Sequence, residues 1–81
     1  MTRAKFTVHR IEHSMSGTGA FARELTTIVL FPVSGGEEGS ENRRFWDATP
    51  AGEIRLSTVS AEAAAGFALG AAYYIDFTKA A

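Results

Sequence analysis

The sequence predicts a small α+β protein, mainly β with one short helix, whose strands form a curved antiparallel sheet or a partly open barrel. Three observations favour this class. Several short runs alternate apolar and polar residues with the period of a strand, one alanine-rich run has helical spacing, and glycine or proline separates the runs. The expected order is β-β-β(β)-α-β, within a single domain that spans residues 1–81.

Residues 3–13 are predicted to form the first strand. Phe6 and Val8 share one face because side chains alternate along a strand, but Ile11 breaks this parity. Either the apolar face switches or a β-bulge lies near His9-Arg10, and bulges are frequent in curved sheets.

Residues 14–20 contain two glycines and are expected to form a turn, followed by a second strand over residues 21–33. The run Ile28–Phe31 is apolar at every position, so this end of the strand should be covered on both faces. Pro32 ends the hydrogen-bonded ladder or places the segment at an edge. The closeness of the two strands predicts an antiparallel hairpin.

The next segment, residues 34–42, combines glycines with three carboxylates and is expected to be a loop. Thr49–Gly52 has proline at its second position, as a β-turn favours. Residues 53–59 then alternate as a strand, with Ile54 and Leu56 directed inward.

Ser60 is a suitable N-cap for a helix from Ala61 to about Leu69, which is expected to cover one face of the sheet or to plug one end. Gly70 suits the left-handed position that often follows a helix. Residues 71–78 form the last predicted strand, in which two rows of side chains alternate: Tyr73, Ile75 and Phe77 against Tyr74, Asp76 and Thr78.

Composition narrows the classes of partner. A net charge of −1 argues against a long nucleic acid, and without an apolar run of about 18 residues we expect no membrane partner. The chain has no cysteine and no signal-peptide pattern, which excludes thiolate metal sites and favours a cytoplasmic protein. Alanines account for 14 of the apolar residues, which leaves 23 larger ones. So small a core should be marginal alone, so we expect a homo-oligomer.

Three motifs support a resemblance to a family. They are Arg3-Ala4-Lys5-Phe6, the segment Glu41–Trp46 followed by Thr49-Pro50-Ala51-Gly52, and Tyr73–Thr78. Together they resemble a group of small proteins encoded by tailed bacteriophages, over most of the chain. The resemblance implies phage origin and a shared fold, and carries no catalytic or binding residue with it. Ala68-Leu69-Gly70-Ala71 stands where that group often has Pro-Gly-Lys, which removes a basic residue.

The cluster Arg43-Arg44-Phe45-Trp46 is the most informative candidate site. Guanidinium groups bind phosphates and an aromatic face stacks on a base, so Arg43, Arg44 and Trp46, joined by Tyr74, are predicted to bind an anionic ligand or a partner protein. The alternative is structural: an aromatic fills the core, and an arginine pairs with Glu41 or Asp47.

Other candidate chemistry is weaker. His9 and His13 have no third ligand near in sequence, so we expect surface histidines and no metal site. Motifs for a nucleophilic serine or a phosphate-binding loop are absent from the sequence, and neither an enzyme nor a cofactor is expected.

The sequence therefore favours a non-enzymatic phage accessory protein that acts by binding. One mechanism is an oligomeric sponge that holds a small anionic host-defence signal, such as a nucleotide, in the host bacterial cytoplasm. The first alternative is a virion component, a head or tail accessory subunit that contacts other phage or host proteins. The second alternative is a module that binds single-stranded nucleic acid.

Overall fold

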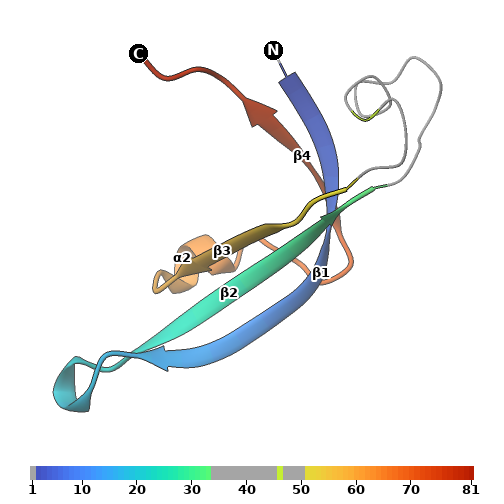
Figure 1. Ribbon diagram of the computed structural model, residues 1–81. Helices are drawn as coiled ribbons and strands as arrows, with labels where there is room; N and C mark the ends of the chain where they lie inside the picture. The colour runs from blue at the N-terminus through green and yellow to red at the C-terminus, as the bar shows by residue number, and fades with distance from the viewer. Residues whose placement is uncertain (1, 34–45, 47–50) are drawn as a thin grey trace.

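A computed structural model describes residues 2–33, 46 and 51–81 of the chain and contains one antiparallel sheet (Figure 1). Its strands are β1 (Thr2–Ser16), β2 (Arg23–Pro32), β3 (Ile54–Thr58) and β4 (Ala72–Phe77). Their order across the sheet is β3-β2-β1-β4. The mainly β class and the order β-β-β-α-β are confirmed, with the helix α2 (Ala61–Ala64) between β3 and β4.

The sheet is open. Of the two architectures that the sequence predicts, the sheet is therefore found and the barrel is not, because β3 and β4 lie at opposite edges. The strand β1 joins two offset pairings: Thr2–Thr7 pair with β4, and Phe6–Ser16 pair with β2. The described fold is consequently elongated, about 52 × 32 × 19 Å along its principal axes.

A β-bulge interrupts β1, as the sequence predicts. Val8 lies opposite Leu30 and Arg10 lies opposite Val29, so His9 is an extra residue in the ladder. Two consecutive residues on one strand then face one residue on the other, which restores the alternation of side chains. Because of the bulge, Val8 and Ile11 lie on the same face of the sheet.

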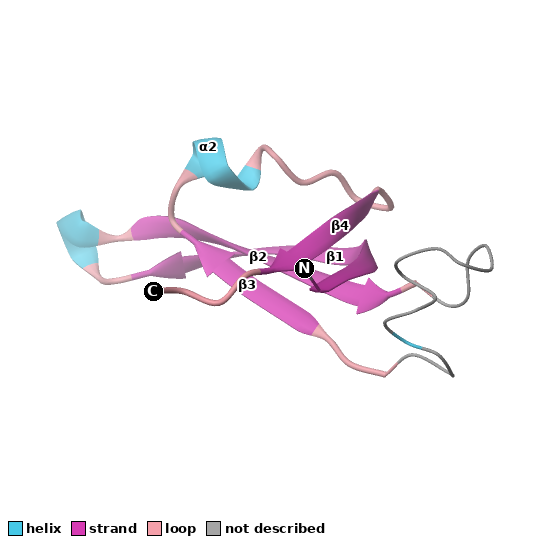
Figure 2. Ribbon diagram, turned by 90° about the horizontal axis from the view of Figure 1, so that it is seen from above, coloured by secondary structure: helices cyan, strands magenta, loops and turns pink. Residues whose placement is uncertain are grey.

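We call that side the core face. It carries five buried apolar residues: Ala4, Phe6, Val8, Ile28 and Leu30. Half-buried side chains pack around them from β1, β3, β4 and the segments between strands: Ile11, Trp46, Ile54, Phe67, Tyr73 and Ile75. Figure 2 shows α2 above this sheet, on one side only, so the helix covers a face rather than plugging an end.

We call the opposite side the outer face. Val29 is buried there, between Arg10 and Arg55 in the register of the strands, which confirms that this part of β2 is covered on both sides. Phe31, two residues further along β2, is 37% exposed. Neighbouring side chains therefore bury the outer face of β2 at Val29 but not at its last residues.

The helix is shorter than the sequence predicts. The side chain of Ser60 accepts a hydrogen bond from Ala63 N at 3.1 Å, as expected of an N-cap, but α2 ends at Ala64. The Tyr73 hydroxyl accepts from Ala68 N at 2.9 Å and donates to Gly66 O at 3.2 Å. These bonds use backbone groups that a longer helix would need, and Gly66 is itself a poor helix former. Gly70 has a positive φ of 82°, as expected, but lies in the turn before β4.

Several boundaries also differ from expectation. The first strand continues to Ser16, and the turn begins at Gly17, whose φ is 88°. A Cβ on Gly17 would lie 2.8 Å from Phe21 O, so glycine is required by space as well as by conformation. Leu56 shares a face with Ile54 and was expected to point inward, but it is 47% exposed because β3 is an edge strand with no neighbour on its other side among the described residues. The predicted loop 34–42 and the first two residues of the predicted turn, 49 and 50, lie outside the described residues.

Candidate binding surfaces

Trp46 belongs to the core face. Its ring meets that of Phe6 edge to face, with the centroids 6.0 Å apart and the planes at 61°. The side chain is half-buried and packs against the cluster of buried residues. Its contact with Phe6 agrees with the alternative in which an aromatic side chain of this cluster fills the core.

Tyr74 belongs to the outer face. It lies opposite Lys5 in the β1–β4 register and is 54% exposed. The Arg3 guanidinium carbon is 5.2 Å from the ring centroid and the Lys5 Nζ is 5.6 Å from it. Both cations are within the distance at which the electron-rich face of an aromatic ring attracts a positive charge.

The four predicted site residues are therefore not brought together as one pocket. Neighbouring residues on a strand point to opposite faces, and the neighbour of Tyr74, Tyr73, lies opposite Phe6 on the core face. Trp46 and Tyr74 consequently lie on opposite sides of the sheet. Arg43 and Arg44 lie outside the described residues, so their part in a site stays a prediction.

An ion pair orders the corner around Tyr74. Arg3 Nε donates to Asp76 Oδ1 at 2.5 Å and Arg3 Nη2 donates to Asp76 Oδ2 at 3.1 Å, so the pairing is bidentate. This hydrogen-bonded guanidinium lowers the pKa of Asp76 from its ordinary value. The corner around the exposed Tyr74 ring thus holds two cations, Arg3 and Lys5, and one carboxylate, Asp76, which is paired with Arg3.

We predict that the ion pair is measurable by titration. Because the folded-state pKa of Asp76 is lowered, the carboxylate stabilises the fold above the ordinary aspartate pKa. This contribution is lost as the pH falls through the lowered value. An NMR titration of the Asp76 side-chain carboxyl carbon should give a midpoint below that of a model peptide. Arg3→Gln should move the midpoint upward, and equal midpoints in the two proteins would contradict the assignment.

Sequence reasoning singled out Tyr74 but missed Arg3, Lys5 and Asp76 as its neighbours. Because side chains two residues apart on a strand share a face, the sequence does place Arg3 and Lys5 on one face of β1, and Tyr74 and Asp76 on one face of β4. The missing information is that β1 and β4, which are far apart in sequence, lie side by side.

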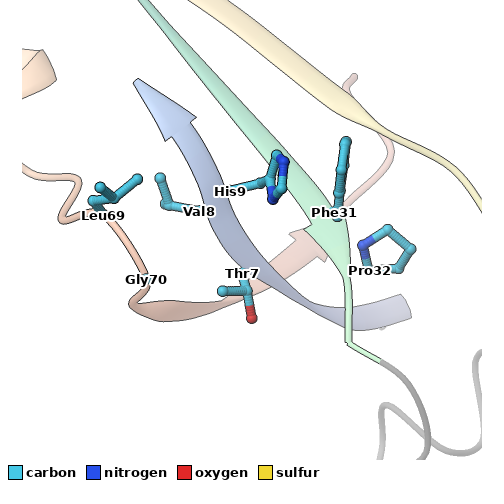
Figure 3. Close-up of a pocket in the computed structure, with 7 residues that line it drawn as sticks. All are labelled: Thr7, Val8, His9, Phe31, Pro32, Leu69 and Gly70. Atoms are coloured by element: carbon cyan, nitrogen blue, oxygen red, sulfur yellow. The ribbon is translucent and has the colours of Figure 1, made fainter. Parts of the chain in front are cut away.

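A shallow hollow of about 380 Å³ lies beside the bulge (Figure 3). His9 stacks on Phe31 there, with ring centroids 4.3 Å apart and planes at 18°. Exposed Leu69 and the backbone of Gly70 lie across β1 from this pair. His9 directly follows Val8 of the core face, so its side chain points to the outer face, where it reaches Phe31. The spacing of the two histidines alone does not reveal this contact.

A second hollow, of about 300 Å³, lies under α2. His13 Nδ1 is 3.2 Å from Glu24 Oε1 and 3.4 Å from Thr26 Oγ1 at its rim. His9 and His13 therefore lie on opposite faces and are both exposed, as surface histidines are. Within residues 2–33, 46 and 51–81, no three His, Asp or Glu side chains gather as metal ligands would.

Comparison with protein-family models, curated proteins and solved structures finds no match to this chain. Among the described residues, no helix has the length and apolar character needed to cross a membrane. The binding surfaces are therefore interpreted from their own geometry: the Tyr74 corner, the His9–Phe31 hollow and the two edges of the sheet.

Proposed function

We propose that the chain is a non-enzymatic phage accessory protein that acts as a subunit of a protein assembly, such as a head or tail structure. One observation carries the proposal: within the described residues, more large apolar side chains are exposed than buried. Five large ones are buried, and eight are exposed: Met15, Phe21, Phe31, Leu56, Val59, Leu69, Tyr74 and Phe77.

The arrangement of these side chains supports a protein partner. Exposed apolar groups on a small domain are stabilised when another protein removes them from water. Phe21 is 86% exposed and ends the short 3-10 helix η1 (Gly19–Phe21) between β1 and β2. Figure 1 shows that this turn lies at the opposite end of the sheet from β4. A subunit with apolar groups at both ends suits contacts with more than one neighbour. The resemblance of its motifs to small phage proteins agrees with this role.

The outer face is a poorer candidate for a nucleic-acid surface. Three of its arginines have carboxylate partners: Arg3 with Asp76, Arg10 with Glu12 at 3.0 Å, and Arg55 with Glu53 at 3.7 Å. Nucleic-acid binding gains affinity mainly from cations that neutralise phosphates. Ion pairs already made within the chain weaken that attraction.

Mass spectrometry of purified particles of the phage that encodes the chain tests the proposal. The chain should be present at a fixed number of copies per particle after washing in high salt. A salt-washed particle without the chain, from cells in which the chain is abundant, would overturn the assembly role. The control is a non-structural phage protein of similar abundance, which must be absent from the same particles.

The Tyr74 corner supports a second candidate, the binding of a small anionic ligand. The exposed Tyr74 ring can stack on a base, and Lys5, whose Nζ lies 5.6 Å from the ring centroid, can contact a phosphate beside it. A panel of linear and cyclic nucleotides should then raise the melting temperature of the folded chain, and Lys5→Gln should reduce the shift. A panel without any shift would eliminate this candidate and leave the assembly role intact.

A further inference from the structure

The backbone of β4 has an outward-facing edge whose hydrogen-bonding groups are identifiable from the register. Val8 N donates to Ala71 O at 3.0 Å and Gly70 N donates to Val8 O at 2.9 Å, so the backbone groups of Val8 point toward β4. Backbone groups alternate in direction along a strand. Phe6 and Ala4 therefore also point toward β4, and their partners Tyr73 and Ile75 point back.

The residues between them point the other way. The N–H and C=O groups of Ala72, Tyr74 and Asp76 face outward, where no strand of the described chain pairs with them. Such a row is a template for another strand unless lysine, proline or a bulge protects it. The register of β4 with β1 is continuous, and β4 contains neither lysine nor proline. Its one charge, Asp76, is neutralised by Arg3 of the same chain.

The other edge is better protected. The same alternation, carried across β2, makes Arg55 and Ser57 the outward residues of β3. Arg55 is half-exposed, and its partner Glu53, at 3.7 Å, directly precedes the same edge strand, so both charges stay at that edge. Asp76 of β4, in contrast, is paired with Arg3 of the inner strand β1. Charged side chains on an edge strand discourage pairing.

We propose that β4 pairs antiparallel with β4 of a second copy, so that two sheets join into one of eight strands. This inference rests on the proposed role as an assembly subunit and names its first contact. The two-fold axis is perpendicular to the sheet and passes midway between Ile75 of one copy and Ile75 of the other. The core faces of both copies therefore lie on the same side. Such an interface is isologous, the commonest arrangement among homodimers.

The side chains of β4 complement themselves in this register. On the core face Ile75 meets Ile75 of the second copy, and Tyr73 meets Phe77, which is 51% exposed in the single chain. On the outer face Tyr74 meets Asp76 of the second copy. That carboxylate approaches the ring over which Arg3 and Lys5 lie. Directly opposed aromatic and apolar pairs stabilise a sheet.

Neighbouring registers are less favourable. Moving the axis to Asp76 would place two carboxylates directly opposite each other, which destabilises a strand pair. Moving it to Tyr74 would leave Phe77 without an aromatic partner. A slip of a single position in the register would turn the core face of one copy against the outer face of the other.

Sedimentation of the full chain and a cysteine cross-link test the inference. Ile75→Cys introduces the chain's only cysteine into a pair with a Cα separation of about 4.5 Å, which is within disulfide range. Mild oxidation should yield a covalent dimer from Ile75→Cys and none from Leu56→Cys on β3. Equal cross-linking at the two sites, or a wild-type monomer throughout the concentration range, would overturn the proposal.

A matched pair of variants isolates the backbone contact. Tyr74→Ala and Tyr74→Pro both remove the ring, but only proline removes the outward N–H. The proline variant should raise the dimer dissociation constant at least about tenfold over the alanine variant, with circular dichroism unchanged. Ser57→Pro removes an outward N–H from β3 and should leave the dimer intact.

The two sets of experiments distinguish failure of the β4 contact from failure of the assembly role. A β4 dimer that is missing from phage particles would overturn the assembly role and keep the contact. A monomer that is present in particles would overturn the contact and keep the role. Binding of an extended peptide to the β4 edge of a monomer would show that the occupant is a different protein.

Discussion

Deleting His9 should leave the four-stranded sheet intact, whereas deleting Thr7, two residues earlier, should unfold the protein. The two deletions shorten the same strand by one residue. Their different outcomes follow from the bulge, in which His9 is the extra residue between Val8 and Arg10.

Loss of His9 removes the bulge without moving any other pair. Arg10 would remain opposite Val29, and Val8 would remain opposite Leu30. Every side chain on the core face keeps its direction. The cost is limited to the stacking of His9 on Phe31 and to altered twist, and we expect about 1 kcal/mol of lost stability.

After loss of Thr7, either possible register of β1 turns buried side chains away from the core. If the bulge straightens to absorb the deletion, His9 takes the position opposite Leu30 and Val8 moves to the outer face. If the bulge stays, Ala4 and Phe6 turn away from the core. Exposing a buried valine and burying an imidazole together cost about 3 kcal/mol or more, close to the whole stability expected of so small a domain.

Urea unfolding followed by circular dichroism measures both deletions. The ΔHis9 protein should unfold in one transition near that of the wild type, and ΔThr7 should lack a transition. Similar losses of stability in the two deletions would show that His9 is not a dispensable insertion. An NMR amide spectrum of ΔHis9 checks that the β1–β4 pairing survives, because Thr2–Thr7 must keep their dispersed signals.

The bulge also shows which parts of the fold are encoded locally. The parity break at Ile11 predicted it, and Pro32 after the apolar run Ile28–Phe31 predicted the end of the second strand. Alternation of side chains depends only on strand geometry, so it is legible in a sequence. The early end of the helix was not predicted, because it depends on the Tyr73 hydroxyl, which reaches Ala68 and Gly66 from another element.

The candidate site illustrates the same limit. Tyr74 was selected for its chemistry, but its cations come from β1, about 70 residues away in the chain. Trp46 was assigned to the same pocket because aromatic and basic residues were adjacent in sequence. Its ring instead packs on Phe6, on the other side of the sheet. Composition therefore predicts which groups are available, whereas strand order decides which of them share a face.

Leu30→Ala should cost about 2–5 kcal/mol, a large share of the stability expected of so small a domain, and lower the urea midpoint strongly. Leu30 is fully buried on the core face, between Val8 of β1 and Ile54 of β3. Its side chain therefore joins the first hairpin to the edge strand. The cavity left by alanine cannot be filled by a shift of the backbone, because Leu30 lies within two hydrogen-bonded ladders.

Leu69→Ala is the matched control. The same three carbon atoms are removed, but Leu69 is 68% exposed and lies in the turn before β4, so the loss should stay within about 0.5 kcal/mol. Urea midpoints should separate the two variants while the slopes of the transitions agree. If self-association through β4 contributes to stability, the midpoint of each variant also rises with protein concentration, because only the folded chain binds a second copy. A Leu30→Ala protein that regains its fold at high concentration would then show that assembly compensates for so small a core.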